Sequence, residues 1–263
     1  MALPMILAIL QARVSSSRLP GKVLKPLLGV PMMLRQIERV RRARRIDRLI
    51  VATSVERADD AIETLCTTNG IDCVRGSLND VLDRFYAAAQ PASPDYVVRL
   101  TADCPLADPG LIDEVIEFCL HGGFDYASNA FEPTFPDGLD VEVFRFTCLE
   151  QAWKEARLPS QREHVTPFIN QQPQRFRIGS FRNPVDHSHL RWTVDEPADF
   201  ELVTRIYEAL YPVNPAFSRH DVLELLNRQP ELLRLNDRHV RNAGYQKSLD
   251  ADRRFNGVQP KEG

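Results

Sequence analysis

The chain has 263 residues, of which 43% are hydrophobic and 26% charged, and its 33 Lys and Arg against 36 Asp and Glu leave a formal net charge of −3. This composition is typical of a globular protein and excludes a disordered chain, a collagen-like repeat and a basic nucleic-acid coat. No apolar run approaches the roughly 20 residues of a membrane-spanning helix, so we expect no membrane contact. With no signal-peptide pattern and no Cys-x-x-Cys pair among five cysteines, we expect a cytoplasmic protein with reduced thiols.

The first 130 residues alternate short apolar runs with amphipathic stretches. The runs expected to form strands are Met5–Gln11, Leu49–Thr53, Ile71–Arg75 and Tyr96–Leu100. The stretches expected to form helices start near Pro31 and cover Asp59–Asn69, Asp80–Gln90 and Leu111–Leu120. Alternation of strand and helix at this spacing predicts an α/β fold with a mostly parallel, twisted sheet flanked by helices on both faces.

The pattern is less regular after Asp125. Strands are expected at Val141–Phe144, Arg175–Phe181 and, before a helix near Pro197, Leu190–Val194. Further helices are expected at Cys148–Ala156, Arg162–Gln171 and Asp221–Asn227. No linker divides the chain, so we predict one domain over residues 1–235 with a small sub-domain around residues 130–190. Residues 236–263 are polar, and we expect a tail that is mobile or docked on a partner.

A basic loop follows the first predicted strand. Between Arg13 and Lys22 the chain carries three cations, which are Arg13, Arg18 and Lys22, and three hydroxyls, which are Ser15, Ser16 and Ser17. Open α/β sheets bind ligands at the carboxyl ends of their strands. The cations can therefore converge on a polyphosphate, while the serine region supplies neutral donors. The alternative is a solvated loop that happens to be basic.

Two familiar phosphate motifs are absent from this loop. A Walker A sequence would need glycine at Ser16 and Ser or Thr at Val23, and no Gly-x-Gly-x-x-Gly sequence follows the strand. The loop is therefore not expected to serve P-loop hydrolysis or a nicotinamide dinucleotide.

The string Ala-Arg-x-x-Ser-Ser-Arg-Leu-Pro-Gly-Lys after a buried strand resembles the cytidylyltransferases that activate acidic sugars, the CMP-KDO and acylneuraminate (CMP-sialic acid) synthetases. The greatest similarity is to their SpsF-like branch, named for spore-coat polysaccharide biosynthesis, over roughly residues 5–235. The resemblance implies a GT-A-like, Rossmann-type fold and a Mg²⁺-dependent transfer of CMP from CTP to a sugar-like acidic acceptor. It also implies phosphate contacts by the loop cations, with Gln11 and Ala12 beside the nucleotide.

A second motif, Arg75-Gly76-Ser77-Leu78-Asn79-Asp80-Val81-Leu82-Asp83-Arg84, follows the third predicted strand. In the family this stretch borders the cytosine and ribose, which implies that Arg75, Gly76, Ser77 and Asp80 line the base pocket. Taken alone, Ser77 and Asp80 are equally suited to capping the next helix. Both roles are compatible with the sequence.

Two acidic motifs complete the resemblance. Asp103 follows a predicted strand in Thr101-Ala102-Asp103-Cys104-Pro105, and Asp195 lies in a Val-Asp-x-Pro-x-Asp segment. The family implies that these two carboxylates hold Mg²⁺, a hard cation that prefers oxygen ligands, with Thr101 near the nucleotide. The alternatives are a turn acid before proline for Asp103 and a helix cap for Asp195.

The acceptor site is implied by two further stretches. A Pro-x-Gly-x-Asp-x-Glu sequence contains Asp140 and Glu142, and a later segment contains Arg162 and His164. The alternatives are turn formation and edge protection for the first stretch, and a surface or satisfied core histidine for His164. This chain has Thr101 and Ala102 where the acid-sugar synthetases carry Gln and Gly, so the resemblance does not name the acceptor.

The expected partners are CTP and a small sugar-like acceptor, and a homodimer is expected by analogy with the family. No nucleic acid is expected, because the arginine cluster of residues 39–48 ends an amphipathic helix, where cations complement the helix C-terminus. One rival function is a GT-A glycosyltransferase, although Asp103 is followed by Cys104 and Pro105 and no Asp-x-Asp motif arises there. The other is a non-catalytic nucleotide-binding scaffold.

Overall fold

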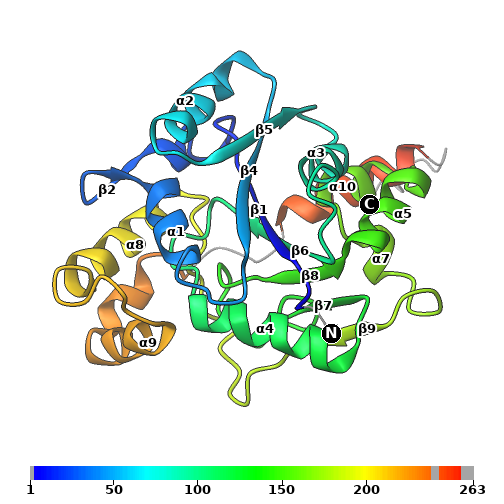
Figure 1. Cartoon of the computed structure of the whole chain (residues 1–263). Coiled ribbons are helices and arrows are strands. Elements are labelled where there is room, and N and C mark those ends of the chain that lie inside the picture. Colours follow the sequence, from blue (N-terminus) through cyan, green and yellow to red (C-terminus); the bar gives the residue numbers. More distant parts are fainter. Residues whose placement is uncertain (1–2, 238–242, 256–263) are drawn as a thin grey trace.

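The computed structural model describes residues 3–237 and 243–255 (Figure 1). A seven-stranded sheet runs through it in the order β5-β4-β1-β6-β8-β7-β9. The strands are β1 (Ile6–Gln11), β4 (Arg48–Ser54), β5 (Asp72–Gly76), β6 (Tyr96–Thr101), β7 (Tyr126–Ser128), β8 (Glu142–Arg145) and β9 (Ile178–Ser180). Among these strands β8 alone runs antiparallel to its neighbours, so the predicted mostly parallel sheet is confirmed.

Helices cover both faces of this sheet. They are α1 (Met32–Val40), α2 (Asp60–Thr68), α3 (Val81–Ala89), α4 (Pro109–Gly122), α5 (Phe146–Glu155), α6 (Pro159–His164), α7 (Pro167–Asn170), α8 (Pro197–Leu210), α9 (Arg219–Arg228) and α10 (Ala243–Phe255). Figure 1 shows α3 and α5 on one side of the sheet and α1 and α8 on the other. None of the helices in the described ranges is long and apolar enough to cross a bilayer.

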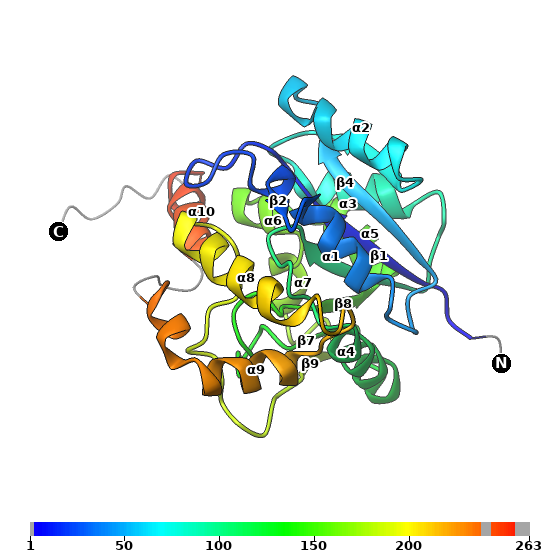
Figure 2. The same ribbon diagram turned by 90° about the vertical axis from the view of Figure 1, so that its left-hand side faces the viewer.

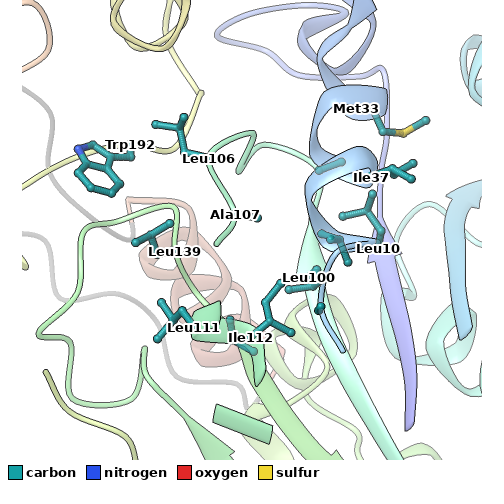
Figure 3. Close-up of a cluster of buried hydrophobic side chains, with 14 of the residues drawn as sticks. Leu10, Met33, Ile37, Leu100, Leu106, Ala107, Leu111, Ile112, Leu139 and Trp192 are labelled. Carbon is teal, nitrogen blue, oxygen red and sulfur yellow. The ribbon is translucent and has the colours of Figure 1, made fainter. Parts of the chain in front are cut away.

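The continuous apolar run of β1 is explained by burial on both faces. Ile6, Ala8 and Leu10 pack with α1, α4 and α8, whereas Leu7 and Ile9 pack with α3 and α5. Figure 3 shows Leu10 beside Ile37 of α1 in the first of these clusters. Because successive strand side chains point to opposite faces, a strand between two helical layers needs apolar residues at every position.

The strand order reverses next to β1. The chain runs outward from β1 to β4 and β5, and then returns to place β6 on the other side of β1. Gln11 and Thr101, the last residues of β1 and β6, are paired in register. The loops that leave these two ends diverge, and such a switch point is where open α/β sheets form a binding crevice.

The segment predicted as one helix over 162–171 is two helices. Val165 has φ +70° and ψ −55° and separates α6 from α7. Pro167 follows closely, and a proline lacks the N–H that an uninterrupted helix would need at this position. The predicted single helix is therefore wrong, and α7 begins at that proline.

One other prediction for the second half of the chain also fails, and one strand was missed. Residues 190–194 do not form a strand of the sheet, and they contribute only an isolated bridge between Arg191 and Asp137. Strand β7 was not predicted, because a run of three residues is too short to show a period.

Part of the expected tail is a helix docked on its own chain. Helix α10 packs against α6 (Figure 2). Asp252 accepts a hydrogen bond from the Ser160 backbone at 2.8 Å, and the Ser248 hydroxyl lies 2.9 Å from His164 Nε2. These contacts are polar, so apolar periodicity could not reveal the helix. Residues 238–242 and 256–263 lie outside the described residues, and the predicted domain limits stay predictions.

Gly138 holds the loop after β7 against the segment that carries Asp195. Its φ is +105°, and a Cβ atom would lie 2.4 Å from the Thr193 backbone nitrogen. We expect Gly138→Ala to lower the free energy of unfolding by about 2–4 kcal/mol, from a left-handed backbone together with a backbone clash. Urea denaturation measures it. Gly29→Ala is the control, because φ there is +76° but the Cβ would meet nothing within 4 Å. Equal losses in the two variants would contradict the close approach.

Candidate active site

A cleft of about 810 Å³ opens at the switch point between β1 and β6. Its walls come from the loop after β1, the loop after β6, the start of α3, the α6–α7 segment and residues 191–195. Its size lies in the range of cavities that enclose a small ligand or cofactor. The predicted sites at the ends of β1 and β6 thus face one space.

Lys22 is the centre of the cleft's charge arrangement. Its Nζ donates to Asp103 Oδ2 at 3.1 Å, to Asp195 Oδ1 at 2.7 Å and to the Val194 carbonyl at 2.8 Å. The lysine is 8% exposed. Burial alone would lower its pKa, but the two carboxylates raise the pKa above the ordinary lysine value, so the ammonium stays charged.

Asp103 is an ionised acid at the end of β6. Thr101 Oγ1 donates to its Oδ1 at 2.5 Å. Burial would raise the pKa of Asp103, but Lys22 and the Thr101 hydroxyl lower it to about 2. The neighbouring Cys104 thiol has a pKa well above its usual value because of burial and the Asp103 charge, so it stays protonated and is no nucleophile. Asp103 thus faces a cation, which an ordinary turn acid need not do.

Asp195 is surrounded by positive charge. Its Oδ2 lies 2.9 Å from Arg18 and 3.2 Å from Arg191, in addition to the Oδ1 contact with Lys22. The residue that precedes the first turn of α8 as its N-cap is Glu196. The alternative that Asp195 merely caps this helix is therefore wrong.

Arg191 and Asp199 form the buried support of Asp195. Asp199 is fully buried, accepts from Arg191 Nε at 2.9 Å and from Nη2 at 3.0 Å, and also accepts the backbone N–H of Asp195. Burial would raise the pKa of Asp199, but the hydrogen bond from Arg191 keeps the pKa below its usual value. Asp199 therefore holds both Arg191 and the backbone of Asp195 in place.

We expect Asp199→Ala to lower the free energy of unfolding by about 3–5 kcal/mol, because Arg191 would be left buried with fewer partners. Urea denaturation of the ligand-free protein measures this loss. Glu201→Ala is the matched control on the same helix, where an exposed pair with Arg205 spans 3.8 Å. It should change stability by about 0.5 kcal/mol or less. A similar small effect at Asp199 would show that the buried network does not stabilise the fold.

The basic loop contributes most of its predicted residues to the cleft. Those that line it are Gln11, Ala12, Arg13, Ser16, Ser17, Arg18 and Lys22. Ser15 does not line it. The loop is anchored from below by buried Asp59, which accepts the backbone N–H of Val14 at 2.7 Å. Arg18 and Lys22 contact carboxylates, and Arg13 and Arg18 are both exposed where they line the cleft.

The second motif is placed differently from its prediction. Arg75 turns away from the cleft and forms ion pairs with Asp60 at 2.7 Å and Glu63 at 2.6 Å, both on α2. Ser77 Oγ accepts from the backbone of Asp80, and Asp80 is the N-cap of α3. Gly76 lies at the end of β5. None of these four residues lines the cleft. Their contacts show helix capping for Ser77 and Asp80 and ion pairing for Arg75.

The predicted acceptor residues Asp140, Glu142, Arg162 and His164 all line the cleft. Glu142 Oε1 accepts from Tyr126 at 2.8 Å and from Thr166 at 2.6 Å, and its Oε2 pairs with Arg99. The hydrogen bonds of Glu142 therefore go to protein groups.

Arg162 donates from Nε to Asp80 at 3.0 Å and from Nη1 to the Trp153 carbonyl at 3.0 Å. His164 is kept neutral, since burial and nearby Arg99 lower its pKa. Both residues border the cleft but are held by protein partners.

Three arginines of the cleft wall were not assigned a role from the sequence, namely Arg84, Arg99 and Arg191. Arg84 had a usable signal. It occupies the same helical face as Val81, Phe85 and Ala88, all buried, so a cation interrupts an apolar pattern there. A charged residue on a buried helical face rarely lacks a structural or functional reason.

The acids that could hold a divalent cation are Asp103 and Asp195. They offer hard oxygen donors, and both already contact one cationic group, the Lys22 ammonium. Magnesium uses one or two carboxylates and completes its octahedron with water and phosphate oxygens. Within residues 3–237 and 243–255 no group of three or more His, Cys, Asp and Glu side chains is arranged around a metal position. The donor set fits a metal shared with a bound phosphate.

A family model described as cytidylyltransferase matches residues 7–235. The chain belongs to the cytidylyltransferase family. It is a CTP-dependent nucleotidyltransferase, and the resemblance noted from its motifs is confirmed.

This cytidylyltransferase has relatives along most of its length. It is 37% identical to the uncharacterized protein MJ1063 of Methanocaldococcus jannaschii, over 91% of this chain and 97% of that one. It is 34% identical to the spore coat polysaccharide biosynthesis protein SpsF of Bacillus subtilis, over 86% and 95% respectively. A 3-deoxy-manno-octulosonate cytidylyltransferase of an Anaeromyxobacter species is 34% identical over 51% of this chain and 54% of that one.

Among solved structures, a cytidylyltransferase from Leptospira borgpetersenii superposes with a TM-score of 0.84 at 30% identity, covering 90% of this chain and 99% of that one. This likeness supports the Rossmann-like nucleotidyltransferase fold of the family.

Proposed function

We propose that this cytidylyltransferase transfers CMP from CTP to a sugar or sugar-like acidic acceptor, with release of pyrophosphate, for the synthesis of a surface polysaccharide or glycan. The observation that carries the proposal is the convergence of Asp103 and Asp195 on Lys22 at the switch point of the sheet. These charged groups lie in a cleft large enough for a nucleotide.

The reaction needs little covalent chemistry from the protein. An acceptor oxygen attacks the α-phosphorus of CTP, the bond from that phosphorus to the bridging oxygen breaks, and pyrophosphate leaves with the electron pair. Arg13, Arg18 and Lys22 would contact the triphosphate and stabilise the charge that develops on the leaving group. Positioning of the two reactants supplies much of the remaining rate enhancement.

Asp103 and Asp195 are proposed as the Mg²⁺ ligands. When bound, the ion would neutralise phosphate charge beside these two carboxylates. Lys22 makes the complementary contribution from the protein. Without nucleotide it neutralises both acids, and with nucleotide its ammonium is proposed to turn toward the phosphates.

The acceptor end of the cleft is proposed to lie along β8, α6 and α7, where Asp140, Glu142, Arg162 and His164 are found. Since Glu142 and Arg162 are held by protein partners, they would shape this end, and an acidic group of the acceptor would compete with Asp80 for Arg162. The acidic character of the acceptor is supported by the family resemblance.

Finer structural predictions belong to the same proposal. They are a GT-A-like arrangement, a sub-domain around residues 130–190 that contacts the acceptor, a homodimer and a cytoplasmic location.

The test is release of pyrophosphate from CTP in the presence of Mg²⁺ and a panel of acidic, phosphorylated and neutral sugars. We expect release with an acidic sugar, and label from α-³²P-CTP in the product. If the protein instead transfers sugar from a nucleoside-diphosphate sugar, the glycosyltransferase alternative is correct. Tight CTP binding with no turnover on any acceptor would favour the scaffold.

A further inference from the structure

Helix α6 forms part of the acceptor end of the cleft and is too short to be stable by itself. It spans six residues, and its Arg162, Glu163 and His164 line the cleft. Isolated helices shorter than about 12 residues are marginal in water, so a short helix owes most of its stability to tertiary contacts. The position of these three side chains therefore depends on what holds α6 in place.

The first turn of α6 is capped from a distant part of the chain. Its N-cap residue is Leu158, whose side chain has no polar atom, and Pro159 at its first position has no N–H. The first backbone N–H of the helix belongs to Ser160, and Asp252 Oδ1 of α10 accepts it at 2.8 Å. Asp252 is 8% exposed. A carboxylate that lies 92 residues away in the sequence thus takes the role of an N-cap side chain, and its charge suits the helix dipole.

Ser248 of α10 holds the other end of α6. Its hydroxyl donates to Glu163 Oε2 at 2.7 Å and lies 2.9 Å from His164 Nε2. A hydroxyl has one hydrogen, which is directed to Glu163, so Ser248 accepts from His164 and the neutral imidazole carries its hydrogen on Nε2. The serine is 4% exposed. One buried hydroxyl therefore orients two neighbouring side chains of the cleft wall.

The contacts of α10 are separate from those of the proposed phosphate and metal residues. Ser248 and Asp252 contact α6, and neither of them lines the cleft. Lys22 is held instead by Asp103 and by the segment before α8. A change in α10 should therefore affect the acceptor end of the cleft and leave the triphosphate end in place.

We propose that α10 positions the acceptor wall of the cleft: Ser248 and Asp252 hold α6, and α6 in turn sets the side chains that face the acceptor. This inference rests on the proposed function. Ser248 and Asp252 are positioning residues, because they act through α6 and have no contact with the cleft. A displacement of reacting groups by about 1 Å can lower a transfer rate by up to about 10²-fold.

Asp252→Ala tests the inference, because it removes the cap of α6 and leaves the cleft residues unchanged. The acceptor probe is the sugar of the panel above that gives the fastest pyrophosphate release with the wild-type protein. At saturating CTP we expect kcat/KM for this sugar to fall about tenfold or more. Calorimetry should show a Kd for CTP within about twofold of the wild-type value. Hydrogen–deuterium exchange should become about tenfold faster in residues 158–164 and stay unchanged in residues 12–22.

Two further variants separate positioning from a general loss of stability. Asp252→Asn keeps an oxygen that can accept the Ser160 N–H, so kcat/KM for the acceptor should recover to within about threefold of the wild-type value. Ser248→Ala removes the acceptor of the His164 Nε2–H. Nitrogen-15 NMR should then show both tautomers of His164, whereas the wild-type protein should show the Nε2–H form.

Asp250→Ala is the matched control on α10. Asp250 is about half exposed and pairs with Arg253 on the same helix at 3.1 Å. Its removal should leave the acceptor kcat/KM, the CTP affinity and the exchange of α6 unchanged, since exposed pairs contribute little.

Equal losses of CTP affinity and of acceptor kcat/KM in Asp252→Ala would show that α10 stabilises the whole fold, and would overturn the inference. Wild-type acceptor kcat/KM in both Asp252→Ala and Ser248→Ala would also overturn it. In both cases the proposed function stands, because the wild-type protein still transfers CMP to the probe sugar. If the wild-type protein turns over none of the sugars, the proposed function and this inference fail together.

Discussion

Lys22→Ala should reduce the kcat of CMP transfer by about 10²–10³-fold, the range found when a preorganised charge is removed from a developing anion. The variant loses the ammonium that contacts both Asp103 and Asp195. It also loses the cation proposed to stabilise the leaving pyrophosphate. Steady-state pyrophosphate release at saturating CTP measures kcat, and far-UV circular dichroism checks that the fold is retained.

Lys25→Ala is the control for Lys22. This lysine lies three residues along the same loop but outside the cleft, with its Nζ 5.5 Å from the centre of the Phe200 ring. Its turnover should stay within about twofold of the wild-type value. Unchanged turnover in Lys22→Ala would remove Lys22 from the mechanism.

Asp103→Asn should abolish activation by Mg²⁺ and lower kcat by about 10²-fold or more, because an amide cannot supply the negative charge that a hard cation requires. The substitution is nearly isosteric and leaves an oxygen that can still accept from Lys22 or Thr101. A titration of activity against Mg²⁺ measures the effect. Asp72→Asn, at an exposed acid paired with Arg48, should keep the wild-type response. A normal Mg²⁺ response in Asp103→Asn would exclude Asp103 as a metal ligand.

The same variant has a second readout in the pH dependence of stability. The pKa of Asp103 is lowered from 3.8 to about 2 in the folded state, so the unfolded chain binds more protons between these values. Stability from this group is present above pH 3.8 and is lost as the pH falls toward 2. Urea denaturation over this window should show a smaller loss for Asp103→Asn than for the wild-type protein.

The first half of the fold could be predicted from the sequence, because burial leaves a direct hydrophobic pattern in its strands and helices. Strand β1 is apolar at every position since helices cover both of its faces, and the helices that follow show a clear helical period. Strand β7 and helix α10 lack such a pattern. The first has three residues, and the contacts described for the second are polar ones made by Ser248 and Asp252.

The candidate site could likewise be predicted only in part. Lys22, Asp103 and Asp195 lie in motifs at strand ends or just before a helix, and a switch point brings such positions together. The prediction placed Arg75 in the base pocket, whereas its side chain points toward two acids on α2. The motif does not contain these acids, so it could not reveal this direction. Arg84 was overlooked although it is a cation on the apolar face of α3, and its lack of hydrogen-bond partners is visible only when its neighbours are in place.

Calorimetric titration of the wild-type protein with CTP, UTP, ATP and GTP, each with and without Mg²⁺, tests the central claim most directly. The claim is that Lys22, Asp103 and Asp195 form a metal-assisted CTP site at the switch point. We expect tight binding of CTP alone, and only with Mg²⁺, and the loss of this metal dependence in Asp103→Asn. Binding of no triphosphate, or equal binding of CTP with and without Mg²⁺, would contradict the claim.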